Sequence, residues 1–251
     1  MSRLITALLI AATIVVNGLA NALPINGQQT GEISDRFQVY FTPAGYVFSI
    51  WGVIYLGLIA YGIFQALPRN RDNLLLQSIA TPFWASCLAN IAWILLWHYE
   101  YFGWTLVVML VLLGSLALIY VQFTRYPRPT SAELWCVRVP FSTYIGWITV
   151  ATIANLTVVL EDKDLRPFDM GAEPWALAMV LLGTIIAAAV GWIRRDVAYL
   201  LVIVWAFTGI VVKQGWAMVG TAAALGAAVA ALLVVRSLFS MRAPRIEAPV
   251  P

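Results

Sequence analysis

The stretch Phe41–Leu58, FTPAGYVFSIWGVIYLGL, passes from a Pro/Gly turn directly into a long apolar segment. That segment carries four aromatic side chains, at Tyr46, Phe48, Trp51 and Tyr55. Aromatic rings with a polar tip favour the level at which a membrane helix meets the lipid headgroups. Trp51 and Tyr55 lie a turn or more deeper than that level, and a ligand cavity beside the helix is one explanation of their depth.

The composition around this stretch is that of a membrane protein. Of 251 residues, 62% are hydrophobic and 11% are charged, against about 25% charged in an ordinary soluble domain. A helix needs roughly 20 residues to cross a hydrocarbon core about 30 Å thick. The sequence therefore predicts an all-α, polytopic integral membrane bundle of about eight transmembrane helices. The eight apolar blocks are Leu4–Leu23, Gly45–Leu67, Leu76–Trp97, Trp104–Phe123, Leu134–Leu160, Pro174–Ile193, a shorter Val197–Val212, and Trp216–Val235.

Arginine and lysine are distributed unequally between the loops on the two sides of such a bundle. Ten fall on the side of the N-terminus and four on the other, with Arg138 left unassigned. Positive residues accumulate in short cytoplasmic loops, so we expect both termini to be cytoplasmic and the protein to lie in a bacterial inner (plasma) membrane. Topology accounts for the net charge of +3, and no nucleic-acid partner is expected.

The chain divides by composition into three parts. We predict a five-helix membrane domain over residues 1–160, an additional three-helix segment over 161–236 and a cytoplasmic tail over 237–251. The eighth block is rich in small residues, which let helices pack closely and permit a homodimer without requiring one. An alternative reading of residues 1–22 is a cleaved signal peptide, because Arg3 and an apolar run precede Ala20-Asn21-Ala22.

Two longer connections, 24–44 and 161–173, fall on the same side of the predicted bundle. Long loops in compact proteins are often lids or binding loops, so these two could cover a cavity that opens on that side. The alternative is that both are plain solvated connections.

Helical periodicity gathers aromatic and amide side chains on three faces. The faces are Ala44, Phe48, Trp51 and Tyr55; Phe83, Ser86, Asn90, Trp93 and Trp97; and Tyr144, Trp147, Ala151 and Asn155. An asparagine in hydrocarbon needs a hydrogen-bond partner, so Asn90 and Asn155 should face the bundle interior or a ligand. The pattern is that of a mostly apolar pocket with few polar contacts. It is equally that of amides bonded to neighbouring helices with indoles filling the core.

Three blocks of sequence resemble the TspO/MBR family, the tryptophan-rich sensory or translocator proteins. Pro43-Ala44-Gly45-Tyr46-Val47-Phe48 with Trp51 and Tyr55 is similar to the family's P-x-x-W-V-F-x-x-W-x-x-L-Y signature. Leu88-Ala89-Asn90-Ile91-Ala92-Trp93 with Gly103-Trp104 resembles its L-x-N-x-x-W and G-W elements. Tyr144-Ile145-Gly146-Trp147 with Ala151-Thr152 and Asn155 resembles its fifth-helix run. The resemblance covers roughly residues 1–160, and Tyr46 stands where the family usually has tryptophan.

The resemblance implies a receptor, sensor or carrier that binds a flat hydrophobic ligand such as a porphyrin. Carried over residue by residue, it implies a pocket lined by Trp51, Tyr55, Asn90, Trp93, Trp104, Trp147 and Asn155. A bound porphyrin or haem is the implied cofactor, although none is required. Two alternatives remain: a membrane-embedded enzyme that oxidises or degrades such a ligand, and a facilitator for a lipophilic metabolite. The family's proposed sterol motif, a tyrosine followed by arginine or lysine, is missing from residues 156–163.

Catalytic and metal-binding patterns are sparse in this sequence. The single histidine, His98, could ligate a haem iron or could be an ordinary interfacial residue. A metal site needs several converging His, Cys or carboxylate ligands, and no predicted helix carries such a set. Cys87 and Cys136 suggest packing rather than a disulfide framework. Binding is therefore favoured over catalysis.

Overall fold

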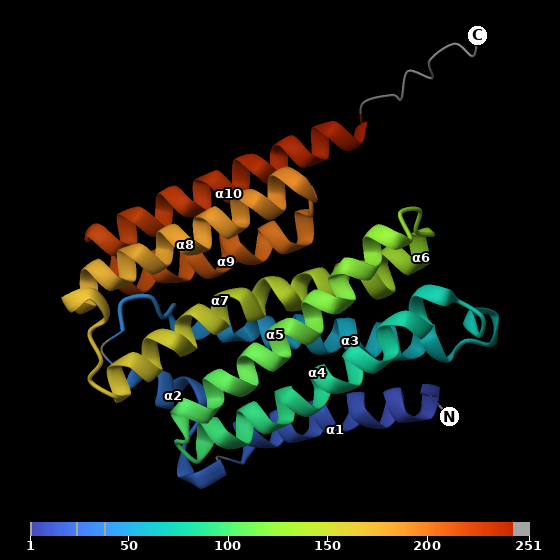
Figure 1. The fold of residues 1–251 in the computed structure, drawn as a ribbon, viewed down its shortest axis with the longest axis horizontal. Coiled ribbons are helices and arrows are strands. Elements are labelled where there is room, and N and C mark those ends of the chain that lie inside the picture. The colour runs from blue at the N-terminus through green and yellow to red at the C-terminus, as the bar shows by residue number, and fades with distance from the viewer. Residues whose placement is uncertain (1, 24, 38, 243–251) are drawn as a thin grey trace.

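The computed structural model describes residues 2–23, 25–37 and 39–242 and is a bundle of long helices (Figure 1). Among these residues, eight helical stretches are long and apolar enough to cross a membrane, which confirms the predicted fold class and helix number. The shortest predicted block, the seventh, forms a helix of 18 residues. The long helices are α1 (Ser2–Ala22), α3 (Ile50–Ala66), α4 (Leu74–His98), α5 (Phe102–Arg125), α7 (Val139–Asp162), α8 (Ala172–Ile193), α9 (Val197–Gln214) and α10 (Met218–Arg242).

Short elements join these helices. They are η1 (Ile25–Gly27), α2 (Thr30–Asp35), η2 (Gly45–Ser49), η3 (Pro68–Asn70), α6 (Ser131–Glu133), the π-helical η4 (Leu134–Arg138) and η5 (Pro167–Asp169). Side-chain caps mark several helix starts. The Asn73 side chain accepts a hydrogen bond from the Leu76 amide at the start of α4, and Asp196 accepts one from the Tyr199 amide at the start of α9. Such caps satisfy amides that a helix start leaves without an intrahelical partner.

Five of the long helices form a ring, in which α1 contacts α3 and α4, α4 contacts α5, α5 contacts α7, and α7 contacts α3. The consecutive helices α3 and α4 approach one another less closely than these pairs, although Tyr61 of α3 meets the edge of the Phe83 ring of α4 at a centroid distance of 4.9 Å. Trp51 of α3 and Trp93 of α4 both line a cavity between the helices of the ring.

The last three long helices pack on one another, and α9 attaches the group to α7. Small residues allow the close approach, as predicted for the eighth block. A Cβ atom at Gly226 would lie 2.6 Å from both the Phe207 ring and the Thr184 hydroxyl. Phe207 is fully buried between these helices. Tight van der Waals packing of this kind replaces the hydrophobic effect as the main force between helices in lipid.

Both long connections lie at the end of the bundle opposite the N-terminus (Figure 1). They meet there, since Tyr40 and Arg166 line one small depression. At the other end, which we call the basic end, are the turns that carry Arg69, Arg125 and Arg194. Helix α10 continues to Arg242, so helix occupies the first part of the predicted tail, and residues 243–251 lie outside the described residues.

Candidate functional site

Aromatic side chains from α3, α4 and α7 converge on a narrow cavity of about 40 Å³, which we call the indole cavity. Trp51 and Trp147 form one wall and the Trp93–Trp97 pair forms another. The two indoles of that pair are stacked, with ring centroids 5.4 Å apart and planes 22° from parallel. Ring pairs in this arrangement attract one another beyond the effect of their buried area. The structure thus brings together the indoles that periodicity placed on three separate helix faces.

Trp51 is the central ring of this group. It stacks on Tyr55 at 5.6 Å and meets the edges of Tyr144 at 6.0 Å and Trp147 at 6.2 Å. Phe48 packs edge-on against the other side of Trp147 at 5.8 Å. Trp51 lies more than one turn inside its apolar segment because it belongs to an aromatic cluster within the bundle, and not to a belt of aromatic residues at the membrane surface.

A second cavity of about 250 Å³ adjoins the first and is lined by Tyr55, Asn17 and Ile94. The two cavities share Thr30, Phe48 and Trp51 in their walls. We refer to the pair together as the indole pocket. Small-molecule sites commonly span about 300–1,000 Å³, so the pocket as it stands lies at the small end of that range.

The two predicted amides are buried and hydrogen-bonded to protein groups. Asn90 accepts a bond of 2.7 Å from the Asn17 side chain and donates one of 2.9 Å to the Tyr144 hydroxyl. Asn155 accepts a bond of 3.1 Å from the Trp93 indole and donates one of 2.9 Å to the Thr105 hydroxyl. These bonds join α1, α4, α5 and α7. The amides thus hold the walls of the pocket in position.

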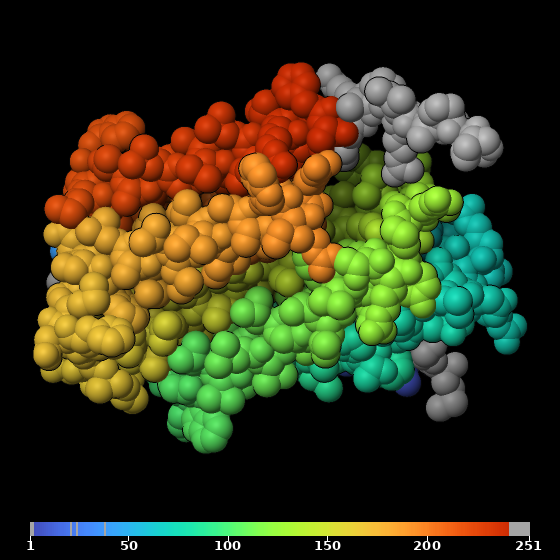
Figure 2. Space-filling model, turned by 45° about the horizontal axis from the view of Figure 1, so that its top comes forward, coloured from blue at the N-terminus to red at the C-terminus, as the bar shows by residue number. Residues whose placement is uncertain are grey.

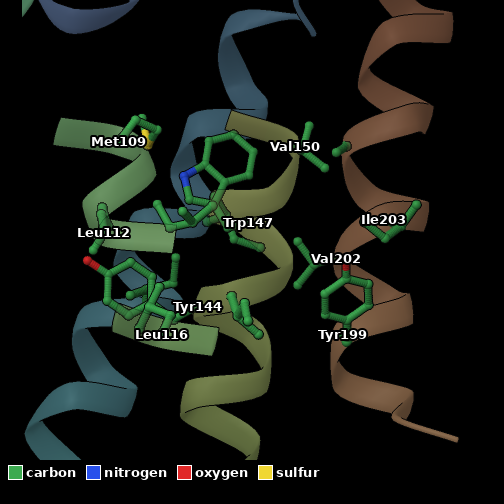
Figure 3. Close-up of a cluster of buried hydrophobic side chains, with 14 of the residues drawn as sticks. Met109, Leu112, Leu116, Tyr144, Trp147, Val150, Tyr199, Val202 and Ile203 are labelled. Atoms are coloured by element: carbon green, nitrogen blue, oxygen red, sulfur yellow. The ribbon is translucent and has the colours of Figure 1, made fainter. Parts of the chain in front are cut away.

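Trp147 differs from the other wall residues because its buried indole Nε1 has no hydrogen-bond partner among the described residues. The side chain is 3% exposed. Figure 3 shows Trp147 and Tyr144 on the side of α7 that faces away from Val202 and Tyr199 of α9. A buried donor without an acceptor costs about 1–3 kcal/mol, which is the energy that an acceptor on a bound molecule could recover.

Residues 25–37, which we call the cover segment, close the pocket at the end opposite the basic end. Trp97 donates its indole N–H to the Thr30 carbonyl at 3.1 Å. The Thr30 hydroxyl lies 3.0 Å from Nε2 of His98, and Nδ1 of His98 lies 3.0 Å from the Ile25 carbonyl. Because a carbonyl only accepts, Nδ1 donates to the Ile25 carbonyl, and Nε2 shares the second hydrogen bond with the Thr30 hydroxyl. Both ring nitrogens of His98 are thus engaged in holding the cover segment, and neither is free to ligate a haem iron.

The cover segment is also tied to the turn between α4 and α5. Asn26 donates to the His98 carbonyl at 3.0 Å, and Gln28 and Arg36 each donate to the Glu100 carboxylate at 2.9 Å. Of the connections predicted to cover a cavity, the first therefore does so. The second, around Arg166, lines a separate depression of about 20 Å³.

Helix α9 supports the continuation of this loop from the opposite side. Lys213 forms a salt bridge of 2.7 Å with Asp35 and a bond of 3.1 Å with the Thr42 hydroxyl. The Ala44 amide donates to the Gly209 carbonyl at 3.0 Å. No sequence motif connected α9 to the pocket. Its contacts nevertheless hold residues 35–44 in place, and we call this part of the loop the roof of the indole pocket.

Two carried-over residues line neither cavity. Asn90 is fully buried and is hydrogen-bonded to Asn17 and Tyr144. Trp104 is 64% exposed at the start of α5 and lines neither cavity. Sequence reasoning also missed lining residues, chiefly Asn17, Thr30 and Thr42. Asn17 carried a usable signal, as an amide within an apolar span, whereas Thr30 and Thr42 lie in a loop whose path no periodicity describes.

The described residues contain no group of three or more His, Cys, Asp or Glu side chains that could hold a metal ion. Cys87 and Cys136 are free thiols. The indole pocket itself is lined by aromatic rings, and the buried Nε1 of Trp147 in its wall has no hydrogen-bond partner among the described residues.

A sequence model of TSPO-like proteins matches residues 3–236. The chain belongs to the TSPO-like family. The match extends across α8, α9 and α10, beyond the residues 1–160 on which the motif resemblance rested. Comparison with curated proteins and with solved structures gave no match. As a TSPO-like protein, the chain is a membrane helix bundle, and the matched residues include all or most of each of the eight long helices.

We expect the attachment of the cover segment in this TSPO-like protein to weaken only in acid. The hydrogen bonds from Gln28 and Arg36, and the charge of Arg36, lower the pKa of Glu100. A lowered pKa means that the ionised carboxylate stabilises the closed cover above the usual glutamate range, and that this contribution is lost as the pH falls through the lowered value. Hydrogen exchange of residues 28–36, corrected for its intrinsic pH dependence, should be constant from pH 8 to about 5. Glu100→Gln should raise that exchange at every pH in this range, and a variant indistinguishable from wild type would contradict the role of Glu100.

Proposed function

We propose that this TSPO-like protein binds a flat, mostly hydrophobic small molecule, such as a porphyrin, in the indole pocket, and that it acts as a receptor, sensor or carrier. The single observation that carries the proposal is the unpaired, buried Nε1 of Trp147 in the wall of a cavity between stacked aromatic rings. An apolar pocket with one oriented donor favours a planar ligand that bears an acceptor.

The size of the pocket bears on how such a ligand enters. Its two cavities, of about 40 and 250 Å³, are small for a tetrapyrrole, so the proposed binding includes displacement of the cover segment. The attachments of that segment are hydrogen bonds and exposed salt bridges, and exposed pairs contribute about 0–1 kcal/mol each. Because no histidine nitrogen is free at the pocket, we propose that stacking, and not iron ligation, holds the ligand.

The same proposal includes the placement of the protein. Positive residues gather at the basic end, which we assign to the cytoplasm of a bacterial inner membrane. The cover segment and the mouth of the pocket would then face outward, where a hydrophobic ligand can arrive from the outer leaflet or from a donor protein.

The test is titration of the purified protein with protoporphyrin IX, followed both by tryptophan quenching and by the absorption spectrum of the porphyrin. Trp51→Ala removes the central stacking surface and should weaken binding by about tenfold or more. Trp147→Phe keeps a ring but removes the unpaired donor, and one hydrogen bond corresponds to about a two- to tenfold loss.

Trp104→Ala is the matched control, because it removes an indole that lines neither cavity. Its dissociation constant should equal that of wild type, although the total quenching will be smaller. Unchanged affinity in both folded pocket variants would overturn the proposal. A spectrum that stays constant after binding, in light and oxygen, would distinguish binding from turnover.

A further inference from the structure

A second cavity, of about 500 Å³, lies at the basic end between the five-helix ring and the last three helices. It is bounded by the ends of α5, α7, α9 and α10, and we call it the basic groove. Figure 2 shows a recess in this position, between the orange residues around the start of α9 and the yellow-green residues near α6. It contains none of the residues of the indole pocket.

Two arginines of the α8–α9 turn, Arg194 and Arg195, line the basic groove. Within the described part of the chain neither forms a salt bridge, and the Arg194 guanidinium lies 5.3 Å from the centre of the Tyr120 ring. The third arginine of the groove, Arg138, is already paired with Glu133 at 2.9 Å. The positive charge available to a ligand therefore comes from the turn.

Among the described residues that line the groove, Asp196 is the one carboxylate, and it is hydrogen-bonded to other groups of the protein. One of its oxygens accepts the Ser142 hydroxyl at 2.6 Å and the Tyr120 hydroxyl at 2.8 Å. The other accepts the Tyr199 amide at the start of α9. Because both oxygens are engaged, Asp196 leaves the guanidinium donors of the turn available to an external anion.

The backbone of Arg195 is also unusual, with a φ angle of +53°. This is the left-handed conformation that glycine commonly adopts just after a helix end, and an arginine there is strained. Strained residues tend to occur at functional sites. In this conformation Arg195 lies in the lining of the groove beside Arg194.

The rest of the lining suits a hydrocarbon chain at the membrane surface. Leu201 and Leu238 are 52% and 44% exposed, so the groove has apolar walls that open toward lipid. Trp135, also in the lining, is 68% exposed, and exposed tryptophan is enriched where the bilayer meets water. A ligand seated here would have its head at the arginines and its tail along α9 and α10.

We propose that the basic groove binds an anionic membrane lipid, with the phosphate or carboxylate of the headgroup on Arg194 and Arg195 and an acyl chain along Leu201 and Leu238. Paired guanidinium groups favour such oxyanions, and basic pockets between transmembrane helices on the cytoplasmic side are suited to acidic headgroups. This inference uses the placement of the basic end in the cytoplasm that is proposed above, but it does not rest on the ligand proposed for the indole pocket.

The test is native mass spectrometry of the full chain in a neutral detergent, titrated separately with dioleoylphosphatidylglycerol, dioleoylphosphatidylcholine and inorganic phosphate. We expect one phosphatidylglycerol to bind at least tenfold more tightly than phosphatidylcholine. We expect no measurable binding of phosphate alone, because it lacks the acyl chain. Equal affinity for the two lipids, or phosphate binding as tight as that of phosphatidylglycerol, would overturn the proposal.

Three variants assign the binding to these residues. Arg194→Gln/Arg195→Gln should lose the preference for phosphatidylglycerol, at about fivefold for each charge. Arg69→Gln/Arg71→Gln removes the same charge from another turn at the basic end, outside the groove. This variant should keep the preference for phosphatidylglycerol. Arg195→Gly relieves the backbone strain, so it should fold at least as well as wild type and still bind several-fold more weakly. Wild-type binding in both Arg195 variants would refute the assignment.

Discussion

Replacing Arg138 with leucine should lower the free energy of unfolding by about 3–5 kcal/mol, because it leaves a buried carboxylate without its partner. Arg138 and Glu133 are joined at 2.9 Å, and their side chains are only 13% and 11% exposed. The guanidinium also donates to the Phe123 and Tyr126 carbonyls. These carbonyls lie at the end of α5, where no intrahelical N–H donors remain to pair with them. One side chain therefore joins the ends of two helices.

Unfolding in mixed micelles, driven by a denaturing detergent and followed by tryptophan fluorescence, measures this effect. Arg125→Leu is the matched control, since Arg125 is exposed at the same end of α5, and it should change stability by less than about 1 kcal/mol. The double variant Arg138→Leu/Glu133→Leu should recover part of the loss, because no charge is then left unpaired. Equal stability of Arg138→Leu and Arg125→Leu would show that the buried pair does not stabilise the fold.

Replacing Gly209 with valine should separate α9 from the roof of the indole pocket. A Cβ atom at this position would lie 2.1 Å from a Val47 methyl group and 3.1 Å from Cβ of Pro43. Overpacking of this kind costs about 1–3 kcal/mol and occasionally more. Because Pro43 lines the indole cavity, the same change should also weaken porphyrin binding.

Gly52→Ala serves as the control for Gly209→Val. Gly52 lies on α3, and a Cβ atom there would meet nothing within 4 Å. Helix propensity favours alanine over glycine by about 0.5–1 kcal/mol, so this control should be slightly more stable and bind normally. Normal stability and normal binding in Gly209→Val would show that the contact between α9 and Val47 can open without cost.

The helices were predictable because bilayer thickness fixes their length, and the positions of Trp51, Trp93 and Trp147 were predictable because one face of each helix repeats every 3.6 residues. The pairing of Glu133 with Arg138 was not predictable from that period. The residues are five apart and are brought together by the π-helical turn over Leu134–Arg138, which departs from the α-helical spacing.

Contacts between distant segments were beyond the reach of the sequence for a different reason. Lys213 and Asp35 are 178 positions apart, and the sequence around either residue does not indicate that the other is its partner. Trp104 shows the reverse difficulty. Its place in a family motif suggested a pocket wall, but the start of α5 turns its side chain outward. The packing of α5 on α4 decides whether the face of α5 that carries Trp104 points into the bundle or away from it.

Helix α9 contacts both sites of the molecule. Near its end, Gly209 and Lys213 hold the roof of the indole pocket, and at its start Asp196 and Val197 line the basic groove. Its 18 residues span about 27 Å as a rigid helix. Any displacement of the roof that admits a ligand must be accommodated by α9. Occupancy of the pocket and occupancy of the groove would then be thermodynamically linked, with a coupling energy that is the same in both directions.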